Sequence, residues 1–279
     1  MNIYAFFKPL IGFYQQLFVR PSLYNLHFYL FNLGLRGMGV LNFENENASG
    51  ELFLLRKLSQ YFNLKICIDV GAHKGNYTKL LLKEIPNSKI FAIEPHPSSF
   101  LALKKRGFPK KVSFYQLALG ERKKTIRLWD HSQHNYGSQH ATIYQEAIEK
   151  LHRSKAKSVT VMMDTLDNFS KKNKIEKINF LKIDSEGSEL GVISGAKKMI
   201  RRQKIDFIQF EFNSMNVNSR VFFDDFNKLL SGYSFFRLLT NGLIELKSNN
   251  PLENEIFAFQ NILAVSHQKL KKFKSALES

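Results

Sequence analysis

Apolar residues follow two different patterns along this chain. Residues 1–60 carry apolar and aromatic side chains at helical spacing, and a periodic run follows Ser49-Gly50-Glu51. From about residue 64, short apolar runs alternate with amphipathic segments, and such runs are typical of strands that are buried on both faces. Seven runs are predicted to be strands: 66–70, 89–94, 112–119, 178–183, 205–212, 235–239 and 257–265.

Helical segments separate these predicted strands. Tyr77, Leu80 and Leu81 share one helix face, and Pro97 opens another helix, as proline favours a first helical position. Single helices are also expected after the fourth and fifth strands. The alternation of strands and helices predicts an α/β fold, namely a doubly wound, mostly parallel seven-stranded sheet with an N-terminal helical extension.

The texture of the sequence divides the chain into three parts. Residues 1–60 are predicted to form an aromatic-rich helical extension, residues 61–267 the α/β domain, and residues 268–279 an exposed basic helix or tail. We expect the first helix to pack on the α/β domain, although an amphipathic helix in a membrane interface fits the same pattern. Within the domain, residues 121–158 are polar and give only weak strand signals.

Several features bear on where the protein works. No stretch approaches 18 uninterrupted apolar residues, so no transmembrane helix is expected. The N-terminus lacks a basic segment and a small-residue cleavage site, which argues against a signal peptide. The single cysteine, Cys67, excludes an internal disulfide and lies in an apolar run, where a buried, inert thiol is expected. These features predict a cytoplasmic protein and leave peripheral contact with a membrane open.

The formal net charge of +17 needs an explanation, because lysine and arginine gather in several clusters. Such a field favours polyanions, which include nucleic acid, an anionic lipid surface and an acidic glycan. A solvated basic surface explains the same charge without any partner. No zinc-finger spacing or aromatic RNA-binding strand accompanies the charge in the sequence, so nucleic acid is not the favoured partner.

The first predicted strand ends in Asp69 and leads through Gly71 and Gly75 into a helix. In a doubly wound sheet this turn lies at the carboxyl ends of the strands, where ligands bind. A dinucleotide fold would have a third glycine where His73 stands, so that the backbone can approach a pyrophosphate. The second strand ends in Glu94, whose carboxylate can accept both hydroxyls of a ribose. A nucleoside ligand without a pyrophosphate therefore fits better.

Six motifs follow one another in order along residues 49–265. They are Ile68-Asp69-Val70-Gly71-Ala72-His73-Lys74-Gly75, Ala92-Ile93-Glu94-Pro95-His96-Pro97, Ala118-Leu119-Gly120, Thr165-Leu166-Asp167, Leu181-Lys182-Ile183-Asp184-Ser185-Glu186-Gly187-Ser188-Glu189 and Phe259-Gln260-Asn261-Ile262-Leu263-Ala264. Together they resemble the FkbM-type methyltransferases. One departure is Gln116-Leu117, where members of that family often have Asn.

The resemblance implies a Rossmann-like class I methyltransferase that uses S-adenosylmethionine to methylate a hydroxyl, often of a sugar in a glycan, lipopolysaccharide or natural product. It also implies a set of cofactor-binding residues. These are Asp69, Gly71, Ala72 and Gly75 along the methionine and ribose, Glu94 and Pro95 at the ribose, Gln116, Leu117 and Ala118 beside the adenine, and Asp184 near the methyl group.

Acidic residues gather around Gly187 at the end of the fourth predicted strand. An unactivated hydroxyl is a poor nucleophile, so methyl transfer needs a base or a metal to activate it. We predict Asp184 as the base or as the group that orients the hydroxyl, with Glu186 and Lys182 as further catalytic candidates. Capping of the following helix explains Glu186 equally well.

A metal-dependent version of the site is the second possibility. Asp184, Glu211 and Asn213 end neighbouring strands and offer oxygen ligands of the kind that Mg²⁺ prefers. This version rests on analogy between folds. A buried salt bridge from Glu211 to Lys182 or Arg201 is the alternative.

Three histidines, His131, His134 and His140, lie in the polar middle of the chain. Their spacing matches no standard metal site, so a loop that faces the substrate, or plain surface, is expected.

Three classes of function remain in view. The leading hypothesis is an O-methyltransferase whose acceptor is a small molecule or glycan, with a lipid-linked glycan compatible with the basic exterior. A nucleic-acid methyltransferase is favoured by the charge alone, since Asp184-Ser185-Glu186-Gly187 differs from the Asn/Asp-Pro-Pro-aromatic sequence of base N-methylation. A non-catalytic nucleoside-binding module is opposed by the complete set of acidic and glycine residues. The pattern favours no particular oligomeric state.

Overall fold

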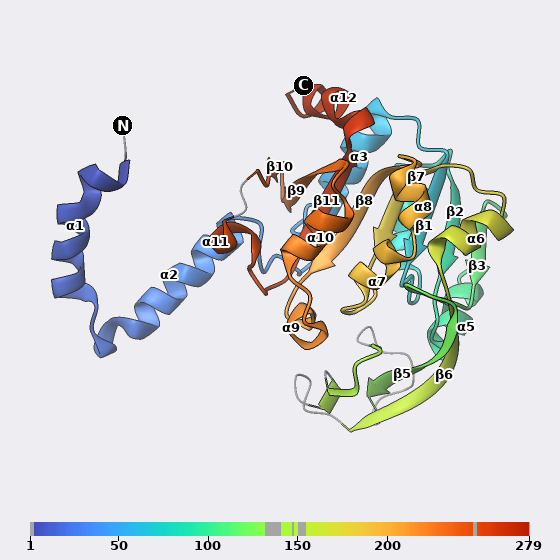
Figure 1. Cartoon of the computed structure of the whole chain (residues 1–279), viewed down its shortest axis with the longest axis horizontal. Helices are drawn as coiled ribbons and strands as arrows, with labels where there is room; N and C mark the ends of the chain where they lie inside the picture. Colours follow the sequence, from blue (N-terminus) through green and yellow to red (C-terminus); the bar gives the residue numbers. More distant parts are fainter. Residues whose placement is uncertain (1–2, 132–140, 147, 150–154, 248–249, 279) are drawn as a thin grey trace.

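The structure is a computed structural model that describes residues 3–131, 141–146, 148–149, 155–247 and 250–278. Its centre is an eight-stranded sheet with the strand order β3-β2-β1-β7-β8-β11-β9-β10 (Figure 1). The strands are β1 Ile66–Val70, β2 Lys89–Ile93, β3 Val112–Tyr115, β7 Ile178–Ile183, β8 Ile205–Phe212, β9 Tyr233–Leu239, β10 Gly242–Glu245 and β11 Gln260–Ser266.

The five strands from β3 to β8 pair in parallel, whereas β11 pairs antiparallel with β8 and β9, and β10 with β9. From β1 the chain builds the sheet towards β3 and then returns to the other side of β1, which confirms the predicted doubly wound, mostly parallel α/β fold. The predicted seven strands are one too few. The extra strand, β10, is only half-buried and offers no apolar run, since Ile244 is exposed.

A second, three-stranded sheet covers the carboxyl ends of the main strands, with the order β4-β6-β5. Its strands are β4 Ala118–Leu119, β5 Lys124–His131 and β6 Ala156–Asp164. The prediction of one strand over 112–119 is therefore wrong, because the chain leaves the main sheet after Tyr115 and pairs with β6 instead. The sequence hides β5 and β6 because only a small apolar cluster, around Leu128 and Met163, lies beneath them.

Helices cover both faces of the main sheet and close two apolar cores. One face is covered by α6 Leu166–Lys172, α7 Glu189–Ser194, α8 Lys197–Arg201 and α10 Phe223–Leu229. The opposite face is covered by α3 Glu51–Tyr61, α4 Asn76–Glu84, α5 Pro97–Lys105 and α12 His267–Glu278. Two short helices, α9 Met215–Ser219 and α11 Pro251–Asn254, follow β8 and precede β11. Cys67 is fully buried, as predicted, and burial raises the pKa of its thiol to about 12.

Two of the predicted helices differ in the structure. The helix after the fourth predicted strand is broken into α7 and α8 at Gly195, where a Cβ would lie 2.1 Å from the carbonyl oxygen of Gly120. This close approach ties the helix pair to the turn after β4. The C-terminal segment is helical, but it is not simply exposed, because Phe273 and Ala276 of α12 are buried against the sheet.

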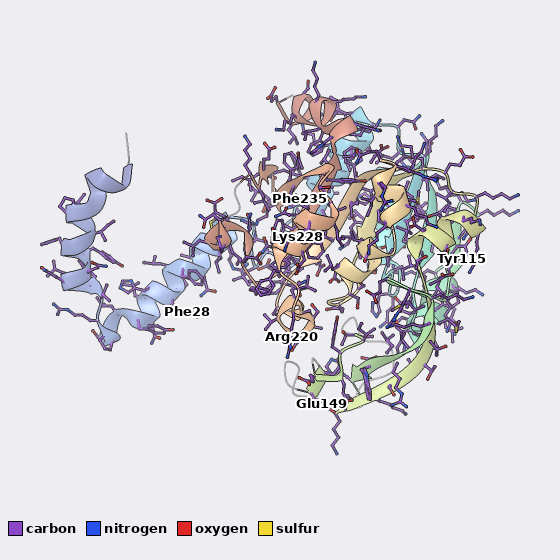
Figure 2. The ribbon with its side chains drawn as sticks, viewed as in Figure 1. Phe28, Tyr115, Glu149, Arg220, Lys228 and Phe235 are labelled. Atoms are coloured by element: carbon purple, nitrogen blue, oxygen red, sulfur yellow. The ribbon has the colours of Figure 1, made fainter. Side chains whose placement is uncertain are left out.

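The N-terminal residues form an arm, which we define as residues 3–37: α1 Ile3–Phe18, a short 3-10 turn at Pro21–Leu23, and α2 Tyr24–Gly37. The arm projects from the body of the molecule, as the ribbon shows (Figure 1). The expectation that its first helix packs on the α/β domain is wrong. Within α2 only Leu35 is buried, and side chains such as Phe28 extend into solvent (Figure 2).

Candidate active site

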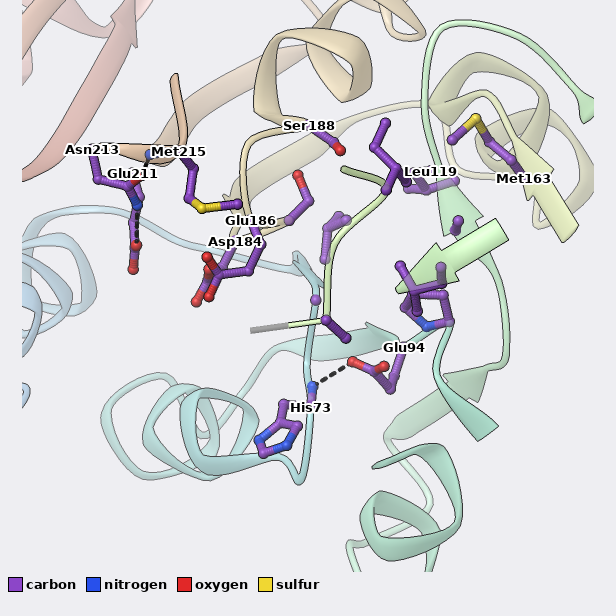
Figure 3. Close-up of a pocket in the computed structure, with 18 of the residues that line it drawn as sticks. His73, Glu94, Leu119, Met163, Asp184, Glu186, Ser188, Glu211, Asn213 and Met215 are labelled. Carbon is purple, nitrogen blue, oxygen red and sulfur yellow. Dashed lines mark hydrogen bonds between the residues drawn. The ribbon is translucent and has the colours of Figure 1, made fainter. Parts of the chain in front are cut away.

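The predicted motifs converge at the carboxyl ends of the parallel strands, where they surround a cavity of about 480 Å³. Strand ends from β1, β2, β7 and β8 contribute to it, and the second sheet forms the opposite wall. Asp184 and Glu186 line this space from the loop after β7, and Glu94 lines it from the end of β2 (Figure 3). Sequence motifs that are far apart in the chain thus share one site.

The turn after β1 is held by a very close backbone approach. Gly71 has a φ of 80°, and a Cβ on it would lie 1.7 Å from the carbonyl oxygen of Asp184. The amides of Gly71 and Ala72 both donate to the carbonyl of Ile93, at 2.9 and 3.0 Å. Only glycine fits this position without displacing the end of β7.

Two other motif residues, Gly75 and Asp69, support this turn without lining the cavity. Gly75 begins α4 with a φ of 84°, and a Cβ there would lie 2.6 Å from Leu103, so its glycine allows α4 to pack on α5. Asp69 is buried, accepts a 2.6 Å hydrogen bond from the Thr78 hydroxyl, and lines neither of the two cavities. Burial raises the pKa of Asp69 to about 6. The structure thus places both residues as supports for the turn rather than at the cavity surface.

Glu94 lies at the end of β2 with both carboxylate oxygens directed by the backbone. Its Oε2 accepts from the amide of His73 at 2.8 Å, and its Oε1 accepts from the amide of His96 at 2.7 Å (Figure 3). Each oxygen keeps a second lone pair that can accept a ligand hydroxyl. Burial raises the pKa of Glu94 to about 7, against the effect of the two amides. The carboxylate is therefore fixed in place and faces the cavity.

The wall beside Glu94 is apolar and comes largely from the second sheet. Of the three residues predicted to lie beside the adenine, Leu117 and Ala118 line the cavity, whereas Gln116 does not. The remaining apolar lining residues of this wall are Leu119, Ile126, Leu128, Ala141, Ile143 and Met163. An apolar wall next to a carboxylate that can accept the hydroxyls of a ribose suits a flat heterocycle such as adenine. Most of this wall could not be predicted, because residues 121–158 are polar and give only weak strand signals.

A buried ammonium group lies among three carboxylates at the base of the site. The Nζ of Lys182 is 3.6 Å from Glu51, 3.6 Å from Glu211 and 3.8 Å from Asp184. Burial lowers the pKa of Lys182, but these carboxylates outweigh burial and raise it well above its usual value. Lys182 therefore stays protonated and cannot act as a base; it neutralises part of the acidic charge.

Asp184 and Glu211 differ in their access to solvent. The side chain of Asp184 is 38% exposed and that of Glu211 is 15% exposed. Burial, reinforced by the nearby charge of Asp184, raises the pKa of Glu211 well above its usual range. Asp184 is thus the carboxylate that an incoming acceptor can reach.

The loop after Asp184 is pinned by a buried glutamate. Glu189 Oε1 accepts hydrogen bonds from the amides of Ser185 and Gly187, at 2.9 and 3.2 Å. Burial raises the pKa of Glu189 to about 7. Glu186, one of the predicted catalytic residues, lines the cavity with a φ of 48°, and its carbonyl accepts from Thr142 at 2.8 Å. This contact links the loop to the segment beside the second sheet.

A second cavity of about 680 Å³ adjoins the first and shares Gly71, Asp184 and Glu211 with it. Lys182 and Ala72 line this second cavity, together with Glu51 and Tyr77. Exposed cations, Lys79, Lys83 and Arg106, also belong to its lining. The site therefore has two compartments that meet at Asp184.

Sequence reasoning missed a buried hydrogen-bond network in this second compartment. The Tyr77 hydroxyl donates to Gln209 at 2.7 Å, and Gln209 donates to Glu51 at 2.7 Å and to Asn261 at 3.0 Å. Tyr77 also lies beneath the ammonium of Lys182, 5.3 Å from the ring centre. Gln209, a polar residue in the middle of the mostly apolar strand β8, was the signal that pointed to this network.

The predicted metal site receives no support. Among the described residues, no group of three or more His, Cys, Asp or Glu side chains is arranged to hold a metal ion. Asn213 donates to Glu211 at 3.3 Å, and its oxygen already accepts from the amide of Met215 at 2.8 Å. His131 ends β5, and His134 and His140 lie outside the described residues.

Comparison with known proteins settles the family. The family model of the methyltransferase FkbM domain matches residues 69–236, which span the glycine turn, the Asp184 segment and both walls of the first cavity. The chain belongs to the FkbM methyltransferase family. The resemblance predicted from the motifs is thus confirmed, and the cavity described above lies within an FkbM domain.

Several solved methyltransferases are similar to this FkbM chain. A methyltransferase FkbM from Methylobacillus flagellatus KT has 15% identity and a TM-score of 0.43, covering 72% of this chain and 44% of its own. The chain therefore spans less than half of that relative. The plantazolicin methyltransferase BpumL, solved in complex with SAH, has 10% identity and a TM-score of 0.43, covering 91% and 93%. No curated protein matches the chain, so the family model carries the assignment.

Proposed function

We propose that the protein is an S-adenosylmethionine-dependent O-methyltransferase that acts on a hydroxyl of a sugar, glycan or related small molecule. One observation carries the proposal. The fixed carboxylate of Glu94 and the reachable carboxylate of Asp184 face one cavity, with an apolar wall beside the first and an acidic cluster beside the second. These are the groups that a ribose, an adenine and a cationic sulfonium would need.

Charge at the base of the site supports this choice of cofactor. At the base of the site, Glu51 and Asp184 outnumber the single ammonium of Lys182 even when Glu211, whose pKa is raised, is protonated. Acidic groups attract the sulfonium and ammonium of S-adenosylmethionine and repel the phosphates of a dinucleotide or a nucleic acid. The same charge opposes the alternative of a nucleic-acid substrate.

The proposed chemistry is an in-line displacement at the methyl carbon. The acceptor oxygen forms a bond to that carbon while the carbon–sulfur bond breaks, and S-adenosylhomocysteine leaves as a neutral thioether. Asp184 orients the acceptor hydroxyl and takes its proton as the new bond forms. The ammonium of Lys182 stabilises the negative charge of Asp184 and does not compete for the proton. Glu189 fixes the loop that follows Asp184.

The cofactor assignment is tested by Glu94→Ala. We expect S-adenosylmethionine to bind at least about 100-fold more weakly, because two hydrogen bonds to a charged acceptor are lost, each worth about 1.5–3 kcal/mol. Calorimetric titration measures the dissociation constant. Glu121→Ala, which removes an exposed carboxylate, should leave it unchanged. An unaltered affinity in Glu94→Ala would remove Glu94 from the ribose site.

Cofactor affinity should also depend on pH. Glu94 has a raised pKa of about 7, so the cofactor-free protein carries it largely protonated at pH 6 and ionised at pH 8. The ionised form accepts stronger hydrogen bonds from ribose hydroxyls, and we expect the dissociation constant to fall by about tenfold across this interval. Glu94→Gln should abolish this dependence. If the slope persists in Glu94→Gln, another buried acid such as Glu189 is responsible.

The acceptor class is tested by product identification. Full-length protein is incubated with methyl-labelled S-adenosylmethionine and separate glycan, small-molecule, RNA and DNA fractions, and the products are identified by mass. We expect label on a hydroxyl oxygen in a glycan or small-molecule fraction. Label in nucleic acid alone, or binding of cofactor with no transfer to any fraction, would overturn the proposal.

A further inference from the structure

The N-terminal arm holds most of the large apolar side chains that the described residues expose to solvent. Figures 1 and 2 show its two helices standing away from the body, with side chains directed outward along both. The exposed apolar residues of the arm are Leu10, Ile11, Phe13, Tyr14, Leu17, Phe18, Val19, Tyr24, Leu26, Phe28, Tyr29, Leu30, Phe31 and Leu33. A surface of this size on a monomer marks an interaction site.

The distribution of apolar side chains around the helix axis distinguishes α2 of this arm from an ordinary amphipathic helix. In α2, Phe28, Tyr29, Leu30 and Phe31 are consecutive and all exposed, so apolar side chains point in every direction from the axis. A helix that is apolar all round is stable only when it is surrounded. One flat protein face would cover a single side of α2, whereas acyl chains and headgroups together surround a helix that is sunk into the interface of a bilayer.

The charge of this region favours a lipid surface. Residues 1–43 contain no Asp or Glu, whereas Lys8 and Arg20 lie within the apolar sequence. Arg36, near the base of the arm, is paired with Glu44. Basic side chains among aromatic ones suit the headgroup layer of an anionic membrane, where Tyr and Phe rings lie at the interface and cations pair with lipid phosphates. The net charge of +17 adds long-range attraction to the same surface.

Helix length fits binding along the membrane surface. The arm helices have 16 and 14 residues, which at about 1.5 Å per residue makes each of them about 24 Å long or less. A bilayer core is about 30 Å thick, so each helix is shorter than the core. Among the described residues, the structure contains no helix with the length and apolar character that spanning a membrane requires.

The base of the arm is fixed to the body beside the active site. The amide of Leu41 donates to the carbonyl of Phe259 at 2.7 Å, and the rings of Phe43 and Phe259 meet edge to face with centroids 5.9 Å apart. Gly39 lies so close to β9 that a Cβ would be 2.4 Å from the carbonyl oxygen of Leu238. Phe43 lines both cavities, so the arm leads straight to their shared mouth.

We propose that the N-terminal arm binds the surface of an anionic membrane and inserts its apolar side chains into the interface. The arm then holds the mouth of the methyl-transfer site next to the lipid headgroups. Binding needs neither cofactor nor acceptor, so its test is independent of the proposed methyltransferase activity.

Vesicle co-flotation of full-length protein tests the proposal. Vesicles of phosphatidylcholine that contain about 30 mol% of the anionic lipid phosphatidylglycerol are compared with vesicles of pure phosphatidylcholine. We expect binding to the anionic vesicles that salt weakens, and at least a tenfold loss of binding in a variant that carries Phe13→Ser, Leu17→Ser, Phe28→Ser and Phe31→Ser. The matched control carries Leu101→Ser, Met162→Ser, Val217→Ser and Phe222→Ser, which replace exposed apolar residues of the body and should retain binding within twofold.

A second measurement follows insertion directly. The chain has one tryptophan, Trp129, in β5, so Phe28→Trp in a Trp129→Phe background reports on the arm alone. We expect a blue shift of its emission with anionic vesicles and quenching by brominated lipid. Equal flotation of the arm variant and the wild type would overturn the proposal. The proposal would also be overturned if light scattering detected a dimer that binds no vesicles and that the arm substitutions convert to monomers. The arm would then bind a second copy of this chain.

Discussion

Asp184→Asn should lower turnover by about 10²–10⁴-fold while leaving the affinity for S-adenosylmethionine within a few-fold of the wild type. The amide keeps the size of the carboxylate but cannot take the proton of an acceptor hydroxyl. Asp184 is the most exposed acid of the buried cluster, and Lys182 cannot replace it because its pKa is raised well above its usual value. Single-turnover rates with the acceptor fraction found by labelling measure the effect.

Two observations separate a base from a group that only orients the acceptor. If Asp184 is the base, the wild-type rate falls at low pH and Asp184→Asn loses that limb of the profile. Asp224→Asn, which changes an exposed acid on α10, should leave the rate and its pH profile unchanged. Turnover that survives in Asp184→Asn would place the base on another residue.

Gly71→Ala should both destabilise the protein and abolish cofactor binding. The alanine Cβ would lie 1.7 Å from the carbonyl oxygen of Asp184, so the turn after β1 and the end of β7 must separate. A positive φ adds about 1–2 kcal/mol for any residue with a Cβ. We expect a total loss of about 3–5 kcal/mol, which lowers Tm by about 6–20 °C for a chain of this size.

Gly107→Ala provides a control that carries only the backbone cost. Gly107 has a φ of 72°, close to that of Gly71, but a Cβ on it would meet nothing within 4 Å. Its Tm should fall by only a few degrees, and S-adenosylmethionine should bind normally. Thermal unfolding and calorimetric titration of both variants measure the comparison. Equal losses of stability would show that the close approach of Gly71 to Asp184 contributes nothing.

The parts of this molecule that the sequence predicted well are those governed by local pattern and by the geometry of parallel sheets. Strands such as β1 and β7 are short, mostly apolar runs, and their carboxyl ends must meet at one edge. Glu94 and Asp184 could therefore be assigned to one pocket although 90 positions separate them. The family resemblance added the cofactor that this pocket is expected to hold.

Contacts between distant segments could not be predicted in the same way. The network of Tyr77, Gln209 and Glu51 joins residues 132 and 158 positions apart, and no local pattern encodes their meeting. The second sheet was missed because its strands bury one face over a small cluster. For the N-terminal arm, the apolar pattern is the same whether a protein or a lipid surface covers the helix, so the pattern could not show that the arm stands away from the α/β domain (Figure 1).

Phe43 connects the N-terminal arm with the active site, because it follows the arm and also lines both cavities. With the arm bound to a membrane as proposed, and with an acceptor in the same membrane, the enzyme would search for that acceptor in two dimensions rather than three. Its rate then follows the mole fraction of acceptor within the lipid surface, and dilution of that surface with inert lipid slows it at constant bulk concentration. Detergent micelles that carry one acceptor each would further restrict the enzyme to a single turnover per encounter.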